Sequence, residues 1–331
     1  MKLNSGLFFK KNIIISGGLG FIGSNLAIRL VDLGANVTIV DSLIPEYGGN
    51  IRNIEPVKNM VKINISDVRD EHSMQYLIQG QDYFFNLAGQ TSHLDSMQNP
   101  FTDLEINSKA QLSILEACRK YNPGIKIIFA STRQVYGKPQ YLPVDEKHPL
   151  FPVDINGINK LSGEWYHIVY NQVYDIKTSV LRLTNTYGPR MRIKDARQTF
   201  LGIWIRNLIE NRPIAIFGDG SQIRDYNYID DVVDAFVSVA GSDQWNGSIF
   251  NLGNDEPISL RTTAEIMIKG NHSGSYVFKP FPDDLKKIDI GDFYSDFSKI
   301  KEILGWYPKV AIQKGINETL NYFRNNYQNY V

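Results

Sequence analysis

Three glycines stand at regular spacing directly after the first strongly apolar segment of the chain. Residues 13–15 are all isoleucine, and Gly17, Gly20 and Gly23 follow them. In a strand–turn–helix unit the first such glycine permits a tight turn, the second lets the backbone approach a pyrophosphate, and the third allows close helix–strand packing. The amino terminus of the helix then stabilises the phosphate charge. Glycine-rich turns also occur without a ligand, so this pattern predicts a dinucleotide site only in a suitable context.

An acidic residue supplies that context. Asp41 ends the next apolar run, where a carboxylate can accept hydrogen bonds from the adenosine ribose hydroxyls and repel a 2′-phosphate. The position favours NAD over NADP, although an ordinary cap or turn residue is the alternative. Asp67 follows the third apolar run and is either an acceptor for the adenine amino group or a second cap.

A parallel sheet with helices is the framework that would bring these residues together. Short β-branched runs alternate with longer amphipathic segments, which is typical of β-α-β units. We expect strands at 12–16, 36–40, 61–65, 82–87, 125–130 and 178–183, and helices at 23–33, 101–121 and 160–173. After residue 185 the elements become shorter and loops with glycine and proline separate them, which indicates a smaller lobe. The predicted fold class is α/β, with a Rossmann-type doubly wound parallel sheet and a smaller C-terminal α/β substrate lobe.

We assign residues 1–184 to the cofactor domain, with 226–254 returning to it, and residues 185–225 and 255–331 to the substrate lobe. No repeat or flexible linker separates the two parts.

Composition points to a small-molecule partner. The 331 residues carry 35 basic and 35 acidic side chains, 43% are hydrophobic, and Cys118 is the single cysteine. A balanced charge offers no footprint for nucleic acid or an anionic membrane, and one cysteine cannot build a disulfide framework or a cysteine-based zinc site. We find no spacing of residues that requires a metal. Residues 1–11 lack signal-peptide features and no apolar run is long enough to span a membrane, so we expect a soluble cytoplasmic protein.

Further segments, taken in order, make the chain similar to the extended short-chain dehydrogenase/reductases. Among these proteins, the sequence resembles the NAD-dependent epimerase/dehydratase family that modifies nucleotide sugars, to which UDP-glucose 4-epimerase belongs. The resemblance runs from Gly17 to about Phe323 and is carried by residues 86–90, Asn107 and residues 130–137, 181–190 and 217–226. It implies that NAD is held by Gly17, Gly20, Phe21, Ile22, Gly23, Asp41, Asp67, Val68, Leu87, Ala88, Gly89, Gln90, Asn107 and Lys160.

The resemblance also implies a catalytic set of a serine or threonine, a tyrosine, and a lysine four residues after the tyrosine. Carried onto this chain, the hydroxyl positions fall on Ser131 and Thr132 and the lysine position on Lys160, but the tyrosine position falls on Asn156. A phenolate beside a lysine and oxidised nicotinamide has a lowered pKa and can take a sugar hydroxyl proton as hydride leaves. An asparagine amide has no comparable proton affinity, so Asn156 can orient a hydroxyl or water but cannot be the base.

Three interpretations of Asn156 stay open. The enzyme recruits another base, either His93, in the loop that borders the family's sugar site, or Tyr136. Alternatively, Lys160 acts through a water molecule. In the third interpretation redox chemistry is lost and the protein only binds its ligands. Because the hydroxyl residues and the lysine are retained, we favour adapted catalysis; His93 could equally be a hydrogen-bonded loop histidine.

The two residues after the hydroxyl pair bear on the reaction. Family dehydratases carry an Asp-Glu pair there and decarboxylases use a Glu at the second position, whereas this chain has Arg133 and Gln134. Elimination is therefore disfavoured, and reversible oxidation with return of hydride, which is epimerisation, is favoured. A dehydratase or decarboxylase with unusual acids and a catalytically reduced binding protein are the alternatives. Arg133 could contact a uronate carboxylate or face a phosphate or the surface.

The resemblance places a nucleotide-diphosphate sugar in the C-terminal lobe. Asn185 and Arg224 would face the diphosphate, since a guanidinium fork suits two phosphate oxygens; a salt bridge of Arg224 with Asp225 or Asp230 is the alternative. Gln134 would also line the substrate site. Three arginines cluster in the same lobe, namely Arg190, Arg192 and Arg197. Some of these three would complete the anion pocket. Family members commonly dimerise through the helices placed here at 101–121 and 160–173, so a homodimer is expected.

Overall fold

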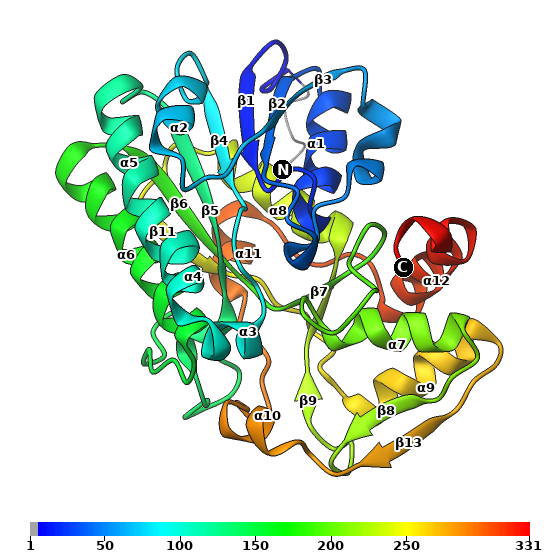
Figure 1. Cartoon of the computed structure of the whole chain (residues 1–331). Helices are drawn as coiled ribbons and strands as arrows, with labels where there is room; N and C mark the ends of the chain where they lie inside the picture. Colours follow the sequence, from blue (N-terminus) through cyan, green and yellow to red (C-terminus); the bar gives the residue numbers. More distant parts are fainter. Residues whose placement is uncertain (1–5) are drawn as a thin grey trace.

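The computed structural model describes residues 6–331, and a seven-stranded parallel sheet forms its centre (Figure 1). Residues 1–5, part of the segment on which the signal-peptide expectation rests, lie outside the described residues. From one edge to the other the sheet contains β11 (Ser248–Asn251), β6 (Lys177–Leu183), β5 (Lys126–Thr132), β4 (Tyr83–Asn86), β1 (Asn12–Ser16), β2 (Asn36–Asp41) and β3 (Val61–Ile65). The chain order reverses between β1 and β4, and ligands of doubly wound sheets bind at such switch points. The predicted fold class is confirmed.

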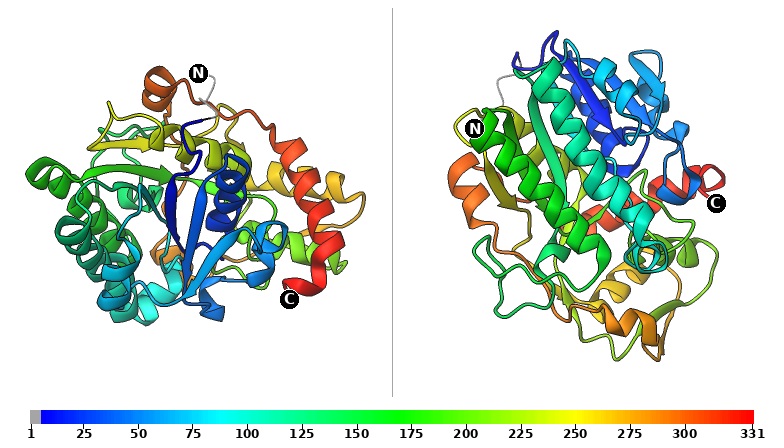
Figure 2. Two further views of the ribbon diagram at one scale, coloured as in Figure 1. Left: turned by 90° about the horizontal axis from the view of Figure 1, so that it is seen from above. Right: turned by 60° about the vertical axis from the view of Figure 1, so that its left-hand side comes forward.

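Both faces of the sheet are covered, which explains the continuous apolar run of β1. Ile13 and Ile15 pack with Leu26 of α1 (Phe21–Asp32) in one core, and Ile14 packs with Ile114 of α5 (Ala110–Tyr121) in the other. Alternate residues of a strand face opposite sides, so a strand between two helical layers is apolar at every position. The first face also carries α8 (Ile229–Ala240), and the second carries α2 (Glu71–Leu77) and α6 (Ile155–Tyr174). Figure 2 shows α5 and α6 lying side by side across the sheet.

Two helices differ from the predicted segments in ways that matter for the site. The segment predicted as one helix at 101–121 consists of α4 (Pro100–Leu104), a π-helical turn η3 (Glu105–Lys109) and α5. The helix predicted at 160–173 begins earlier, at Ile155, because the side chain of Asp154 accepts a hydrogen bond from Gly157 N and caps it. Asn156 and Lys160 therefore lie one turn apart on α6, where side chains four residues apart share a face.

Short helices occupy several loops around the main sheet. They are η1 (Pro45–Tyr47), η2 (Ile51–Val57), α3 (His93–Gln98) and η4 (Arg133–Tyr136). Of these, η1 and α3 follow the carboxyl ends of β2 and β4, so they border the switch point.

The C-terminal part adds small sheets and helices beside the carboxyl edge of the main sheet (Figure 1). Its strand pairs are β7 (Asn185–Tyr187) with β10 (Tyr226–Tyr228), β9 (Ile223–Arg224) with β12 (Ile258–Ser259), and β8 (Ile214–Phe217) with β13 (Tyr276–Lys279). Its helices are α7 (Phe200–Ile209), α9 (Leu260–Asn271), α10 (Asp283–Lys287), α11 (Ser298–Leu304), α12 (Ile312–Asn326) and η5 (Tyr327–Asn329). The predicted domain boundaries stay a prediction. Within residues 6–331, no helix has the length and apolar character needed to cross a membrane.

Candidate functional site

The glycine turn after β1 leaves room that a side chain would fill. Gly17 has φ +68°, and a Cβ there would lie 3.0 Å from Ala88 Cα. A Cβ at Gly23 would lie 2.3 Å from the Gly17 carbonyl oxygen, and one at Gly20 would lie 3.1 Å from the same atom. Gly20 is the N-cap of α1 and has no side chain to cap the helix. The first-turn N–H groups of α1 are thus open to an anion, which fits the pyrophosphate of a dinucleotide.

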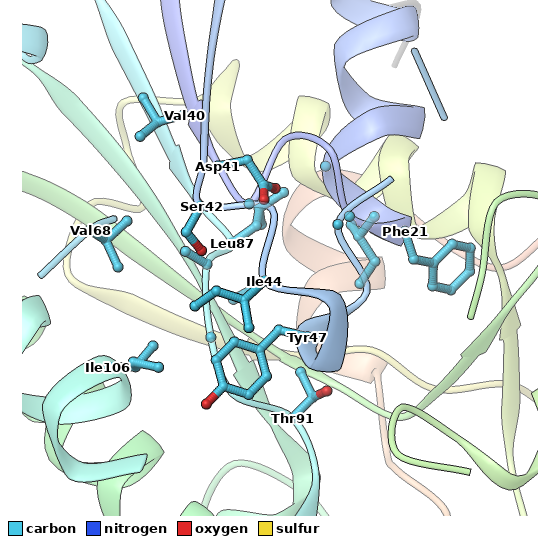
Figure 3. A pocket seen from close by; sticks show the side chains of 18 of the residues that line it. Phe21, Val40, Asp41, Ser42, Ile44, Tyr47, Val68, Leu87, Thr91 and Ile106 are labelled. Carbon is cyan, nitrogen blue, oxygen red and sulfur yellow. The ribbon is translucent and has the colours of Figure 1, made fainter. Parts of the chain in front are cut away.

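A pocket extends from this turn along the carboxyl ends of β1, β2 and β4 (Figure 3). All the residues predicted to hold the cofactor line this pocket, except Gln90, Asn107 and Lys160. Those that line it are Gly17, Gly20, Phe21, Ile22, Gly23, Asp41, Asp67, Val68, Leu87, Ala88 and Gly89. In Figure 3 the ring of Phe21 points away from the other labelled side chains.

Part of the pocket wall consists of residues that were not predicted from the sequence. The additional residues include Ser42, Ile44, Tyr47, Thr91, Ile106 and Gln198. In Figure 3 the Tyr47 ring lies below Ile44 with its hydroxyl directed towards Ile106, and burial raises the pKa of that hydroxyl. The proximity of residues 42–47 to Asp41 was the available signal, but Gln198 comes from a distant loop that only the fold brings to the pocket.

The two predicted acidic residues have different surroundings. Asp41 accepts hydrogen bonds from the backbone N–H groups of Leu19, at 3.0 Å, and Leu43, at 2.9 Å. Burial raises the pKa of Asp41, and these two bonds oppose the rise. Asp67 is held by the Arg69 guanidinium, at 2.7 and 3.0 Å, which lowers the pKa of Asp67. Asp41 keeps lone pairs for further donors, whereas the charge of Asp67 is largely neutralised.

The other three predicted cofactor residues meet behind Gly89. A Cβ on Gly89 would lie 2.9 Å from both Lys160 Nζ and Asn107 Oδ1. Lys160 donates to the Ala130 carbonyl oxygen at 3.2 Å, and burial lowers the pKa of Lys160 to about 8 although Asp103 and Glu164 oppose the change. Asn107 Nδ2 donates to Gln90 O at 2.9 Å, while its buried Oδ1 has no hydrogen-bond partner within residues 6–331. A buried ammonium and an unsatisfied acceptor therefore stand directly behind Gly89, which lines the pocket.

Asn156 is held inside a buried polar network. Its Nδ2 donates to Gln90 O at 2.8 Å and to Asp103 Oδ2 at 3.0 Å, and Asn159 Nδ2 donates to Asp103 Oδ1 at 2.8 Å. Asp103 lies on α4 and is fully buried. These bonds link α4 to α6 and occupy both amide hydrogens of Asn156. Asp103 carried no signal in the sequence, because its partners are more than 50 residues away.

The two hydroxyl residues of β5 have different partners. Ser131 Oγ donates to Glu164, which forms a buried ion pair with Arg182 at 2.6 Å. Thr132 Oγ1 accepts from Gln134 N at 3.2 Å and keeps its own hydrogen for another acceptor. Thr132 is therefore better placed than Ser131 to hold a substrate hydroxyl.

Tyr136 is a poor candidate for the base. It is fully buried, and its hydroxyl is bonded to Arg182 at 2.8 Å and Asn251 at 2.7 Å. Burial raises the pKa of Tyr136 to about 12. His93 is more accessible: its side chain is 36% exposed, and its Nδ1 lies 3.0 Å from Oδ2 of the fully buried Asp154.

Arg133 and Arg224, two of the residues predicted to bind substrate, are a partly buried and a buried arginine, respectively. Arg133 Nη2 donates to Asn185 Oδ1 at 3.3 Å, and its buried Nη1 has no hydrogen-bond partner in the described part of the chain. Burial and the nearby Arg224 lower the pKa of Arg133 to about 10. Asp225 is buried nearby, and burial raises its pKa to about 7. Arg224 forms its ion pair with Asp289, at 3.7 Å, and not with Asp225 or Asp230 as considered from the sequence.

The other predicted substrate residues are engaged within the protein. Arg190 donates hydrogen bonds to Asn53 O at 3.0 Å and to Asn25 Oδ1 at 2.8 Å. Asn185 Nδ2 donates to Asp225 O at 3.0 Å. Gln134 Nε2 donates to Asp154 Oδ2 at 2.8 Å. Of the other two arginines in the lobe, Arg192 pairs with Asp195 at 2.5 Å and Arg197 with Asp95 at 2.9 Å.

The sheet order and glycine turn place the chain in the Rossmann-type α/β class. The family model described as GDP-mannose 4,6 dehydratase matches residues 14–319. A putative UDP-glucose 4-epimerase of Methanocaldococcus jannaschii is 33% identical over 315 residues, covering 95% of this chain and 99% of that protein. The chain belongs to the NAD-dependent nucleotide-sugar epimerase/dehydratase family of extended short-chain dehydrogenase/reductases.

Solved structures agree with this assignment. The UDP-glucose 4-epimerase of Thermotoga maritima with UDP-glucose has a TM-score of 0.88 and 31% identity, covering 96% of this chain and 99% of that chain. The UDP-glucuronic acid 4-epimerase of Bacillus cereus, in complex with UDP-glucuronic acid and NAD, has a TM-score of 0.85 and 28% identity, covering 96% and 100%. Other relatives of about 30% identity are UDP-sugar decarboxylases.

Proposed function

We propose that the protein is a cytoplasmic NAD-dependent nucleotide-sugar epimerase. The observation that carries this proposal is the pair Arg133 and Gln134 directly after Thr132. Neither side chain can donate a proton to a leaving hydroxyl and then act as a carboxylate base. A site without an acid at these positions suits a reaction that only removes and returns hydride. The relatives that are epimerases support the same conclusion.

NAD is the proposed cofactor, because the pocket provides what each part of it needs. The glycine turn admits the pyrophosphate, Asp41 offers acceptors to the adenosine ribose, and Lys160 with Asn107 provides polar groups behind Gly89. When bound, NAD accepts hydride from a sugar carbon and later returns it. Thr132 would hold the reacting sugar hydroxyl, and Lys160 would contribute positive charge beside it.

We further propose that Asn156 occupies the family's tyrosine position and has a structural role. Both hydrogens of its amide are donated to Gln90 and Asp103, which fixes its orientation. Because an amide has no proton affinity comparable to that of a phenolate, another group must take the sugar proton. His93 is our candidate, since it is accessible and stands beside a buried carboxylate. Lys160 acting through water and a protein that only binds its ligands are the remaining alternatives.

The substrate side is proposed to bind a nucleotide-diphosphate sugar. Arg224 and Asn185 are candidates for the diphosphate. Arg133 Nη1, which has no hydrogen-bond partner among residues 6–331, is a donor for an anionic group on the sugar, such as a uronate carboxylate. Arg133→Ala should then lower kcat/KM for uronate substrates at least tenfold more than for neutral sugars. An unchanged ratio of the two values would remove Arg133 from substrate selection.

A homodimer is also proposed, through the exposed face of α5 and α6 (Figure 2). Trp165, Val169 and Val173 are spaced four residues apart on α6 and are 52%, 43% and 62% exposed, so they form one apolar stripe. Val169→Glu should convert the dimer to a monomer in light scattering after gel filtration. Val277→Glu, at a 40% exposed position on β13, is the matched control; a parent that is monomeric contradicts the proposal.

The activity is tested directly with the purified protein and NAD. We would incubate it in D₂O with UDP-, dTDP-, CDP- and GDP-sugars, neutral and uronate, and follow the products by NMR. Epimer formation without net NADH supports the proposal. A 4-keto product would indicate a dehydratase, loss of carbon dioxide a decarboxylase, and binding without conversion a catalytically reduced protein.

A further inference from the structure

His93 and Asp154 meet at the turn of α6 that carries Asn156. His93 is the first residue of α3, and Asp154 directly precedes α6. Asn156 N donates to Ser96 Oγ at 3.3 Å, which ties α3 to this turn of α6; Figure 1 shows α3 at that end of α6. An imidazole thus lies next to the residue that we place at the tyrosine position.

Asp154 has more partners than a helix cap requires. Its Oδ1 accepts from Gly157 N at 2.7 Å, which is the cap, while its Oδ2 accepts from Gln134 Nε2 at 2.8 Å and lies 3.0 Å from His93 Nδ1. Burial raises the pKa of Asp154, but the contacts with His93, Gly157 and Gln134 outweigh it and the net pKa is lowered. Within residues 6–331 no lysine or arginine forms an ion pair with Asp154. The His93 imidazole is therefore the one basic side chain within ion-pair distance of this buried carboxylate among residues 6–331.

We propose that Asp154, held by Gln134, is the positioning residue that directs His93 to take the proton of the reacting sugar hydroxyl. This inference rests on the proposed function. A carboxylate at Nδ1 keeps the hydrogen of neutral imidazole on Nδ1 and leaves the Nε2 lone pair free. When hydride leaves the sugar carbon for the proposed NAD, the hydroxyl proton would pass to His93 Nε2 and the carbon–oxygen double bond would form. The imidazolium would then be stabilised by Asp154. Return of the proton from Nε2, with hydride delivered to the opposite face of the keto sugar, would complete the epimerisation.

The surroundings of His93 and Asp154 bear on this role. Asp95, on the same helix as His93, forms an ion pair with Arg197 at 2.9 Å and so has its own cation. In the structure the His93 ring N–H is not aligned with Oδ2, and catalytic hydrogen bonds commonly become aligned only when substrate binds. Gln134 fills the second position after Thr132, where a neutral amide donor can orient Asp154 and a carboxylate would repel it.

The test uses the full chain with NAD and three variants. Asp154→Asn preserves the cap, since asparagine and aspartate cap helices about equally, but removes the charge. Asp70→Asn is the matched control, because Asp70 caps α2 and likewise lies close to a histidine in the chain, His72. His93→Gln removes the proposed base.

Two independent measurements are expected to agree. In ¹⁵N NMR of histidine-labelled protein at alkaline pH, His93 of the parent should show the Nδ1–H tautomer, and Asp154→Asn should shift it towards the Nε2–H form common in water. In assays of epimerase activity, His93→Gln should lower kcat about 10²- to 10⁴-fold relative to the parent. Asp154→Asn should lower kcat at least tenfold, with a KM within threefold of the parent value. Asp70→Asn should change neither.

Contrary results can be assigned to one proposal or the other. An Nε2–H tautomer of His93 in the parent, or the same tautomer in parent and Asp154→Asn, overturns the positioning role even if the enzyme epimerises sugars. Activity of His93→Gln within threefold of the parent also overturns it. If the parent converts no nucleotide sugar, the proposed function fails, while the NMR result still decides whether Asp154 sets the tautomer. Because the parent and His93→Gln do not alter the cap, the proposal stays testable if Asp154→Asn fails to fold.

Discussion

Gly23→Ala perturbs the proposed phosphate cradle with a single added methyl group. Its Cβ would lie 2.3 Å from the Gly17 carbonyl oxygen and 2.8 Å from Gly18 Cα, whereas Cβ contacts in proteins stay above 3.0 Å. Relief of the contact with oxygen alone requires a shift of at least 0.7 Å, the difference between 3.0 and 2.3 Å. The partner atoms belong to the backbone, so no side chain can turn aside. The turn and the start of α1 must move apart.

That shift is large compared with the tolerance of a hydrogen bond. A donor–acceptor distance of about 2.9 Å becomes roughly 3.6 Å, at which the bond is lost. Losing one charge-assisted hydrogen bond to a phosphate costs about 1.5–3 kcal/mol, so the Kd for NAD should rise roughly 10- to 100-fold. Calorimetric titration of the full-length protein with NAD measures this change.

Gly124→Ala is the control for Gly23→Ala. A Cβ at Gly124 has no heavy atom within 4 Å, so the affinity for NAD should equal that of the parent. Circular dichroism would show that both variants keep the fold. If Gly23→Ala bound NAD within twofold of the parent, the turn would not be the phosphate site and the cofactor assignment would have to be revised.

Three further predictions concern buried charges. Glu164→Gln leaves the buried Arg182 without its ionic partner, so the free energy of unfolding in urea should fall by about 3–5 kcal/mol; a fall below about 1 kcal/mol contradicts this. Burial raises the pKa of Asp225 from 3.8 to about 7, so the folded state binds more protons in that window and stability falls as pH rises through it. Asp225→Asn should remove that part of the pH slope in urea titrations, and an identical slope would be evidence against it. Burial lowers the pKa of Lys160 from 10.5 to about 8, so the unfolded chain binds more protons between these values and stability should rise with pH there. Lys160→Met should lose this rise, and a rise of the parent's size in the variant would refute the assignment.

Local sequence was sufficient for the fold class and for the glycines and acidic residues of the pocket, and the family resemblance added further residues of its wall. Strand β1, the glycine turn and Asp41 follow one another along the chain, and their spacing reflects steric and hydrogen-bonding demands that neighbouring residues meet together. Element ends were less accurate, as for α6, which begins at Ile155 because of the cap by Asp154. A cap depends on where one side chain turns, and apolar periodicity does not report it.

The tertiary structure decided which polar groups are already occupied and which remain free. Asp103 meets Asn156 across 53 residues, Gln134 meets Asp154 across 20, and Arg224 pairs with Asp289 after a separation of 65. No pattern in the sequence selects such partners, because they depend on how α4, α6 and the C-terminal loops pack against the sheet. In a buried environment each polar group must find a partner. Packing, more than residue type, therefore distinguishes Asn156, which holds two helices together, from His93 and Arg133, which we propose contact the substrate.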